Sequence, residues 1–407
     1  MDVESRIEVV RELCAFEGRR AGTDAERRAA ERVAERLLDL GRPAEIEPTA
    51  VHPQYGYVHA AHCLLGIAGS LIAVEVPALG FALVLLAATS LYLDLEYRAY
   101  LLRRLFFRRV SQNVVSRPPS GDRARLIICA HLDSARTGAA FSPWIARRAA
   151  RLQRAPWLGP FRVLFWSLAL LLPLLGARMA GLDSTAISAL ALVPTLLLLV
   201  GAFALIEIEL SPIVPGANDN ASGVATALSI AERLEAEPLR NLEAWFVFDG
   251  AEEPIQEGMR SFVRSHRDEL DRERTFFLVL DTVGIGAPRF ETDAGWITAY
   301  PADRRLAELC AAIADAGRGS EQGARPLRRG VGGDSMPPRI AGFRSLLLTS
   351  SPDDEPLPHH RLPGDTPETL DPEALGRSQE FALELIRRLD RDLGRKARPA
   401  KVEAAAA

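Results

Sequence analysis

The apolar residues of the chain fall into short runs that end in polar residues and long runs that are almost uniformly apolar. The short runs predict buried strands at Leu126–Ala130, Ala244–Phe248, Phe276–Leu280 and Ser345–Thr349. The segments between them predict helices at about 221–236, 256–270, 302–316 and 372–393. Strands that alternate with helices indicate an α/β fold, with a mostly parallel, mixed sheet and helices on both faces.

Two further helices are expected before the first of these strands, at about 3–18 and 24–40. Thr23 is a suitable N-cap for the second of them, and Gly41 is suited to end it. In sheets of this kind, ligands gather at the carboxyl ends of the strands. The polar residues that directly follow the predicted strands are therefore the candidates for a site.

Four long apolar stretches interrupt this pattern, at about Val58–Val74, Val76–Leu93, Phe161–Ala177 and Thr185–Ile206. Crossing the hydrocarbon layer takes roughly 20 apolar residues, so we expect four transmembrane helices inserted as two hairpins. The first stretch is the weakest, because His59 and His62 lie near its start. The alternative is two buried hairpins of a soluble protein, but runs such as ALALVPTLLLLVGAFALI are too uniformly apolar for an amphipathic core helix.

Arginines flank both hairpins on one side. Five lie in Arg98–Arg109 and four in Arg147–Arg154, whereas the turns within the hairpins carry almost no positive charge. Cytoplasmic flanks of membrane helices collect Lys and Arg, so we expect a multi-pass integral protein of the cell membrane with a cytoplasmic α/β domain. The expected divisions are 1–57, 98–160 (with a basic loop) and 207–395 for that domain, 58–97 and 161–206 for the hairpins, and 396–407 for a disordered tail.

Composition narrows the class of protein only a little. The 407 residues carry a formal net charge of −4, which argues against a nucleic-acid binder because that role usually needs a basic surface. The four cysteines are scattered, without the spacing of a disulfide framework or a CxxC motif.

Imidazole and carboxylate groups follow the predicted strands. His131 ends the run RLIICAH, and Asp133 is placed to orient or polarise it. Asp281 follows the apolar run FFLVL, where a carboxylate without a counter-charge would be costly. Glu252 and Glu253 are neighbours at the exit of another strand and would repel each other unless they shared a cation. One of them can bind metal while the other takes a proton from water.

Two loops add candidates. Asp219, in GANDNASG before a predicted helix, is either a metal ligand or, like Asn220, an N-cap. A single histidine after a strand, such as His131, is by itself more often a structural residue than a metal ligand. Asp334 and Ser335, in GVGGDSMPP, either line a substrate pocket or belong to an ordinary turn. Together, the ordered set of imidazole and carboxylate groups predicts a two-metal hydrolase.

The order HLD, NDNASG, AEE, LDTVG and a late histidine before GDTPETLD resembles the zinc aminopeptidase family, metallopeptidase family twenty-eight. The N-terminal GRRAGTDAERRAAERVAERLLDLG is similar to that family's opening helical region. The likeness covers about 1–50 and 112–390, apart from the second hairpin. It implies a zinc exopeptidase fold of the phosphorylase/hydrolase-like type, here in a membrane-embedded variant.

The resemblance also implies two zinc ions per chain. His131 and Asp281 would hold one ion, Glu253 and a late histidine the other, and Asp219 would bridge them. Glu252 would be the general base.

The late histidine departs from the family's spacing. The family places this ligand four residues before the Asp of its DT motif, and that position here is Arg361. His360 fits if the turn through Pro363 and Gly364 is one residue longer, and His359 is the alternative.

We therefore expect a membrane-anchored, zinc-dependent exopeptidase that hydrolyses N-terminal peptide bonds, with Glu252 and Asp133 in catalytic roles. A peptide substrate and the lipid bilayer are the expected partners, and no nucleic-acid partner is expected. The alternatives are a single-zinc enzyme that resembles glutaminyl cyclases and a catalytically silent membrane scaffold of the same fold.

Overall fold

Parallel strands form the centre of the structure, a computed structural model that describes residues 1–119, 121–153, 159–182, 184–317, 323–353 and 356–397. The four central strands are β3 (Ala124–His131), β4 (Leu242–Asp249), β5 (Thr275–Leu280) and β9 (Arg344–Ser351). They lie in the order β4-β3-β5-β9 and each neighbouring pair is parallel. The strands predicted from the short apolar runs are thus confirmed, as is the mostly parallel, mixed character of the sheet.

Shorter or more polar strands extend the sheet on both sides. The order is β1-β2-β4-β3-β5-β9-β6-β7, and β8 pairs with β6. The added strands are β1 (Glu45–Val51), β2 (Arg109–Ser116), β6 (Ala287–Ala294), β7 (Tyr300–Pro301) and β8 (Arg325–Arg328). All pairings of β1, β2 and β7, and the β6–β9 pairing, are antiparallel.

These added strands were not predicted, because they lack a continuous apolar run. β2 illustrates the reason, since its buried polar side chains find partners within the fold. Ser111 donates a hydrogen bond to Glu26 Oε1 at 2.8 Å, and Asn113 donates one to the carbonyl of Gly258 at 3.0 Å.

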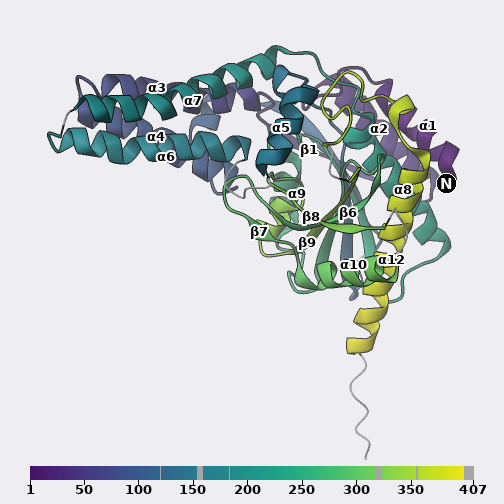
Figure 1. Cartoon of the computed structure of the whole chain (residues 1–407). Coiled ribbons are helices and arrows are strands. Elements are labelled where there is room, and N and C mark those ends of the chain that lie inside the picture. Colours follow the sequence, from purple (N-terminus) through teal and green to yellow (C-terminus); the bar gives the residue numbers. More distant parts are fainter. Residues whose placement is uncertain (120, 154–158, 183, 318–322, 354–355, 398–407) are drawn as a thin grey trace, which may run out of the picture.

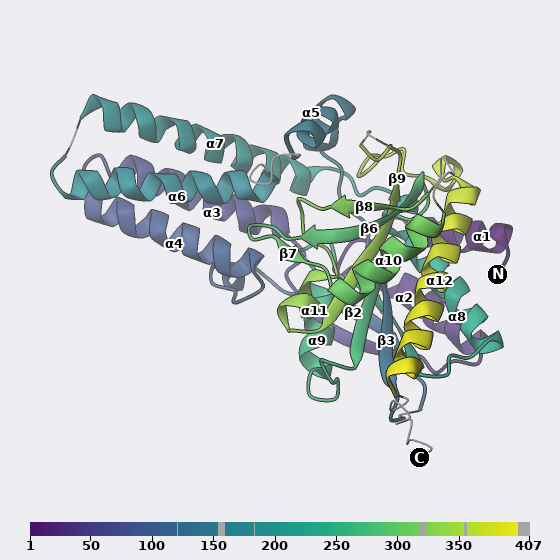
Figure 2. The same cartoon turned by 60° about the horizontal axis from the view of Figure 1, so that its bottom comes forward.

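Helices cover both faces of the sheet (Figure 2). Leu126 and Ile128 of β3 pack in one core with helices from one face, whereas Ile127 and Cys129 pack on the other face with α9 (Glu257–His266). The helices of the first face are α1 (Val3–Cys14), α2 (Asp24–Asp39), α8 (Ser222–Ala236), α10 (Arg304–Ala316) and α12 (Pro372–Ala397).

These helices match the predicted ones to within a few residues, apart from the shorter ends of α1 and α9. Thr23 caps α2 as expected, with its side chain accepting the N–H of Glu26 at 3.3 Å. Shorter helical segments are η1 (Leu102–Leu105), η2 (Ala139–Phe141), η3 (Ala217–Ala221), η4 (Pro367–Thr369) and α11 (Met336–Ile340). The predicted tail lies outside the described residues from residue 398 onwards.

The long apolar stretches form a bundle of helices that projects from the α/β domain (Figure 1). Its members are α3 (Tyr55–Ile72), α4 (Pro77–Leu95), α6 (Pro160–Met179) and α7 (Thr185–Leu210). They share a core of their own, while leucines such as Leu170, Leu190 and Leu196 are exposed on the outside of the bundle. α5 (Pro143–Gln153) lies where a basic loop was predicted, so that part of the predicted loop is a helix.

Three of these helices, α4, α6 and α7, are long and apolar enough to cross a membrane. α3 corresponds to the first predicted span but does not join them, because His59, His62 and several glycines dilute its apolar residues. Of the four expected spans, three are candidates among the described residues, and the first, which was expected to be the weakest, is a less apolar helix that packs with them.

Arg103 joins the bundle to the α/β domain. Its side chain is fully buried, with Nε 2.9 Å from Asp94 Oδ2 at the end of α4 and Nη1 2.6 Å from Glu257 Oε1 at the start of α9. Nη1 also donates a hydrogen bond to the carbonyl of Pro254 at 3.1 Å. Because Pro254 directly follows Glu253, the bundle is tied to the turn that carries the adjacent glutamates.

We expect Arg103→Met to destabilise the protein strongly. The change leaves Asp94 and Glu257 buried without their main counter-charge, and breaking a buried ion pair in this way costs about 3–5 kcal/mol. The check is the thermal unfolding midpoint of the detergent-purified chain, with the neighbouring exposed Arg104→Met as the control. Equal midpoints for the two variants would contradict this role of Arg103.

Candidate metal centre

The carboxyl ends of the central strands bring the predicted ligands together. His131 is the last residue of β3 and lies opposite Asp249, the last residue of β4. Asp281 directly follows β5, and its N–H is held by the carbonyl of Leu348 in β9 at 3.0 Å. Parallel strands therefore place side chains that are far apart in the sequence at one edge of the sheet.

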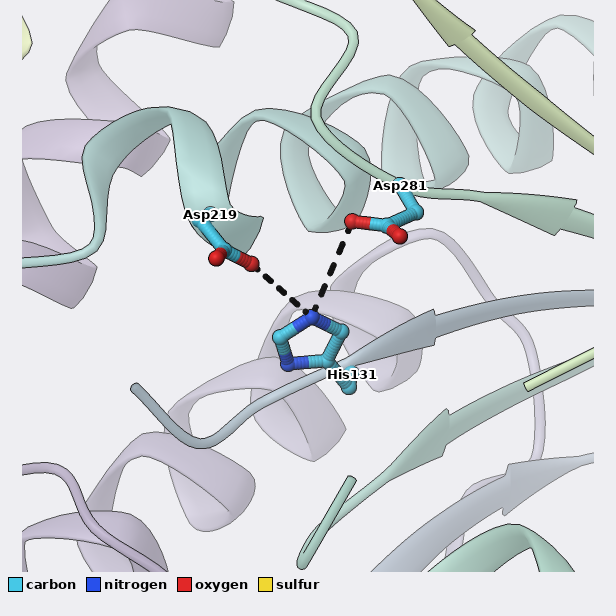
Figure 3. A group of neighbouring side chains, drawn as sticks. All are labelled: His131, Asp219 and Asp281. Atoms are coloured by element: carbon cyan, nitrogen blue, oxygen red, sulfur yellow. Dashed lines mark ion pairs between the residues drawn. The ribbon is translucent and has the colours of Figure 1, made fainter. Parts of the chain in front are cut away.

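His131, Asp219 and Asp281 form a buried cluster (Figure 3). His131 Nε2 lies 3.3 Å from Asp219 Oδ1 and 3.9 Å from Asp281 Oδ1. One ligand atom from each residue lies within 4.8 Å of the others, which is close enough for the three to share one ion. An imidazole nitrogen with carboxylate oxygens is a donor set that suits zinc. Asp281 Oδ1 is buried without a hydrogen-bond partner among the described residues, which further fits a cation there.

The pKa values of the cluster are strongly shifted. Burial works against a charged imidazole, but the nearby carboxylates of Asp133, Asp219 and Asp281 raise the pKa of His131 well above its usual value. Burial also opposes the charge of Asp219, yet His131, His360 and Arg361 hold the pKa of that carboxyl well below its usual range. The centre is thus an arrangement of carboxylates stabilised by neighbouring positive charge.

Asp133 orients both His131 and the adjacent glutamates. Its backbone carbonyl lies 3.0 Å from His131 Nδ1, which leaves Nε2 facing the two aspartates. Its carboxylate accepts the N–H groups of Glu252 and Glu253, to Oδ1 at 2.9 Å and to Oδ2 at 3.1 Å. Orientation of His131 was predicted from the sequence, whereas the contact with the glutamates depends on the turn after β4 coming back to β3.

The loop that carries Asp219 is held in a similar way. Asp365 accepts the N–H groups of Asn218 at 2.7 Å and Asp219 at 3.2 Å. Burial raises the pKa of Asp365 to about 7. Asn220 donates to the carbonyl of Leu280 at 2.9 Å and accepts the N–H of Gly223 at 3.1 Å, so the capping alternative falls to Asn220. Asp365 was not predicted to have this role, although its place in a Gly-Asp-Thr turn was a signal for it.

The adjacent glutamates point to different partners. Glu252 Oε1 accepts a hydrogen bond from Gln256 Nε2 at 2.6 Å, and burial together with nearby Asp281 and Asp133 raises the pKa of Glu252. Glu253 instead faces Arg361, with Arg361 Nη2 2.6 Å from Glu253 Oε2. Gln256, which was not predicted, holds the carboxylate of the candidate base.

The late histidines differ in position. His360 Nδ1 lies 3.5 Å from Asp219 Oδ2, whereas His359 packs beside Gly364. The structure thus brings His360, the favoured candidate, to the predicted bridging carboxylate. Glu253 and His360 lie outside the compact three-residue cluster.

Two further groups line the centre. Arg329 Nη1 lies 3.3 Å from Asp281 Oδ2 and balances that carboxylate. Asp334 is buried near Asp249, and burial raises the pKa of Asp249 to about 7 and that of Asp334 well above its usual value. Asp334 therefore belongs to the buried carboxyl groups around the centre, while the Ser335 hydroxyl donates to Glu291 Oε1 at 3.1 Å. Arg329 was not singled out from the sequence.

The fold is α/β, and the cluster at the strand ends offers the donor set of a metal site. The sequence profile of Peptidase family M28 matches residues 182–386, just over half of the chain. The chain belongs to this family, which confirms the resemblance drawn from the motifs. Among curated proteins, no match to the chain was found.

Solved structures agree with this assignment at the level of the fold. The glutaminyl cyclase of Bacteroides thetaiotaomicron is similar with a TM-score of 0.55 and 14% identity, over 95% of this chain and 97% of that one. The glutaminyl cyclase of Tannerella forsythia has a TM-score of 0.55 and 16% identity, over 95% of this chain and 98% of that one. The aminopeptidase from Aneurinibacillus sp. strain AM-1 has a TM-score of 0.53 and 14% identity, over 95% of this chain and 93% of that one.

We expect Asp133→Asn to weaken zinc binding by about 10–100-fold, the usual effect of removing a group that orients metal ligands. The amide cannot accept both the Glu252 and the Glu253 N–H groups, so the turn loses part of its support. The negative charge 3.6 Å from His131 Nδ1 is also removed, while the backbone carbonyl that faces Nδ1 is kept. Zinc dissociation constants from competition with a chelator provide the measurement, with Asp268→Asn on the exposed surface as the control. An unchanged constant for Asp133→Asn would contradict this role.

Proposed function

We propose that the protein is a zinc-dependent exopeptidase that hydrolyses the N-terminal peptide bond of its substrate. The observation that carries the proposal is the cluster of His131, Asp219 and Asp281 with Glu252 held beside it by Asp133. Membership of a peptidase family supports hydrolysis of a peptide bond. The likeness to an aminopeptidase in fold is consistent with an N-terminal substrate.

When bound, a zinc ion polarises the scissile carbonyl and makes water more acidic. Glu252 takes the water's proton as general base and passes it to the departing amine. Gln256 donates to Oε1 of Glu252, which leaves Oε2 for the proton. Burial raises the pKa of Glu252, which brings this carboxylate closer to the proton affinity that a general base needs near neutral pH.

A single-zinc reaction like that of glutaminyl cyclases is the second candidate. Glutaminyl cyclases are among the structural neighbours. The specific observation in its favour is Arg361, which contacts the glutamate predicted to bind a second ion. In that reaction the N-terminal amine attacks the carbonyl carbon of the glutamine side-chain amide, the bond to the amide nitrogen breaks and ammonia leaves. Glu252 would take the proton of the attacking amine and pass it to the departing ammonia. A two-ion centre has less support from this geometry than a one-ion centre.

We also propose that the bundle anchors the protein in the cell membrane, with the catalytic domain in the cytoplasm. Three helices of sufficient length and apolarity support the anchoring, and exposed leucines give the bundle a surface suited to lipid. The flanking arginines support a cytoplasmic domain. The lipid bilayer and a peptide are therefore the proposed partners.

We expect Glu252→Gln to lower kcat by about 10²–10⁴-fold, the usual contribution of general acid–base catalysis, because the amide cannot take a proton from water. Zinc content should remain that of the wild type, since Glu252 is not a ligand in this proposal. Aminopeptidase assays and elemental mass spectrometry give the two readouts, with Glu273→Gln as the surface control. Full activity of Glu252→Gln would refute the assignment of Glu252 as the general base. A wild type that is inactive on both peptides and N-terminal glutamine substrates would favour the catalytically silent membrane scaffold.

We expect cysteines introduced at Glu75 and Arg104 to be labelled from opposite sides of the membrane. Glu75 lies in the exposed turn between α3 and α4, and Arg104 lies beyond the other end of α4. A membrane-impermeant thiol reagent on intact cells should modify only the cysteine at position 75. Labelling of both positions, or of neither until the cells are lysed, would show that this hairpin does not span the membrane in the proposed orientation.

A further inference from the structure

The carboxylate of Asp219 divides the centre into two halves. Its Oδ1 faces His131, which together with Asp281 completes the first half. Its Oδ2 faces away from His131, 3.5 Å from His360 Nδ1 and 3.9 Å from Arg361 Nε. A carboxylate arranged in this way could serve one ion on each side, so the groups on the second side decide whether a second ion fits.

The second half contains a guanidinium group among its carboxylates. Arg361 Nη2 lies 2.6 Å from Glu253 Oε2, while Nε of the same group approaches Asp219. The ring of Phe141 lies beside the guanidinium, 5.4 Å from its central carbon. The two acids predicted to hold a second ion therefore already share one positive charge.

Arginine cannot take the role of a metal ligand. Its guanidinium carries only N–H donors and stays protonated in proteins, so it has no lone pair to offer. An ion placed between Asp219 and Glu253 would also lie beside a fixed positive charge and be repelled by it. Arg361 occupies the chain position at which the resemblance places the last ligand, four residues before Asp365. The second half therefore does not fit a second ion.

The first half differs in this respect. An arginine also approaches it, but Arg329 lies beside Oδ2 of Asp281, and Oδ1 of that carboxylate still faces His131. The three atoms of the cluster, one from each residue, remain directed at one another. A single ion can bind there without displacing Arg329.

We propose that Arg361 takes the place of a second metal ion, so that the centre binds one divalent ion at His131, Asp219 and Asp281. The guanidinium neutralises Glu253 and the second oxygen of Asp219, which a second zinc would otherwise do. The reaction then proceeds with one ion and a fixed organic cation, in which Arg361 is a positioning residue for Glu253. This inference rests on the proposed zinc-dependent function.

Zinc per chain, measured by elemental mass spectrometry after dialysis of the full detergent-purified chain against zinc, tests the inference. We expect about one ion in the wild type and in Arg361→Lys, which keeps the charge, and about two in Arg361→His, which supplies an imidazole at that position. Arg329→Gln, which removes the other arginine of the centre, should stay at about one. Replacing zinc with cobalt adds a second readout, the electron paramagnetic resonance signal. Two adjacent cobalt ions change each other's signal, whereas a single ion gives an uncoupled one.

Two tightly bound zinc ions in the wild type would overturn the inference while leaving the peptidase proposal intact. One ion in a folded Arg361→His, with the thermal unfolding midpoint of the wild type, would also overturn it. A rise to two ions in Arg329→Gln would do so as well, because a general loss of positive charge would then explain the effect. Absence of zinc from the wild type and all variants would overturn both this inference and the proposed function.

Discussion

The candidate centre depends on one buried carboxylate that is not itself a predicted ligand. Asp133 accepts the backbone N–H groups of Glu252 and Glu253, and its carbonyl lies within hydrogen-bond distance of His131 Nδ1. The strand that delivers the histidine and the turn that delivers the glutamates are thereby held together. Charge-assisted hydrogen bonds of this kind are stronger than neutral ones and are well suited to fix a backbone turn. Asp365 does the same for the loop of Asp219.

This support creates an electrostatic constraint. Asp133, Asp219, Glu252, Glu253 and Asp281 are all buried near one another, and like charges so placed need cations among them or protonation of some of the acids. The described chain supplies His131, Arg329 and Arg361, each in contact with at least one of these acids. The two arginines occupy different positions relative to the ligand atoms. Arg329 lies outside the cluster, whereas Arg361 lies between two predicted ligands, and this difference makes the two halves of the centre chemically unequal.

The helical bundle is coupled to the same turn. Arg103 contacts Asp94 at the end of α4, Glu257 at the start of α9 and the carbonyl of Pro254 beside the glutamates. Breaking a buried ion network is costly, so these contacts hold the bundle to the turn of Glu252 and Glu253. The bundle therefore contacts the turn beside the centre through the side chain of Arg103, in addition to its covalent connection through the chain.

The sequence alone determined the central strands, the helices that cover them, the family and the residues that meet at the strand ends. These features leave local signals, because strands buried on both faces are continuously apolar and ligands follow them directly. The tertiary structure decided the rest. The edge strands were missed because side chains such as Ser111 and Asn113 satisfy their polarity with partners distant in the sequence. The contacts of Asp133, Asp365 and Arg361 likewise join segments more than a hundred residues apart. The sequence showed only that Arg361 stands where the motif places a histidine. Its position between two carboxylates could not be predicted, because the fold brings those carboxylates together from distant parts of the chain.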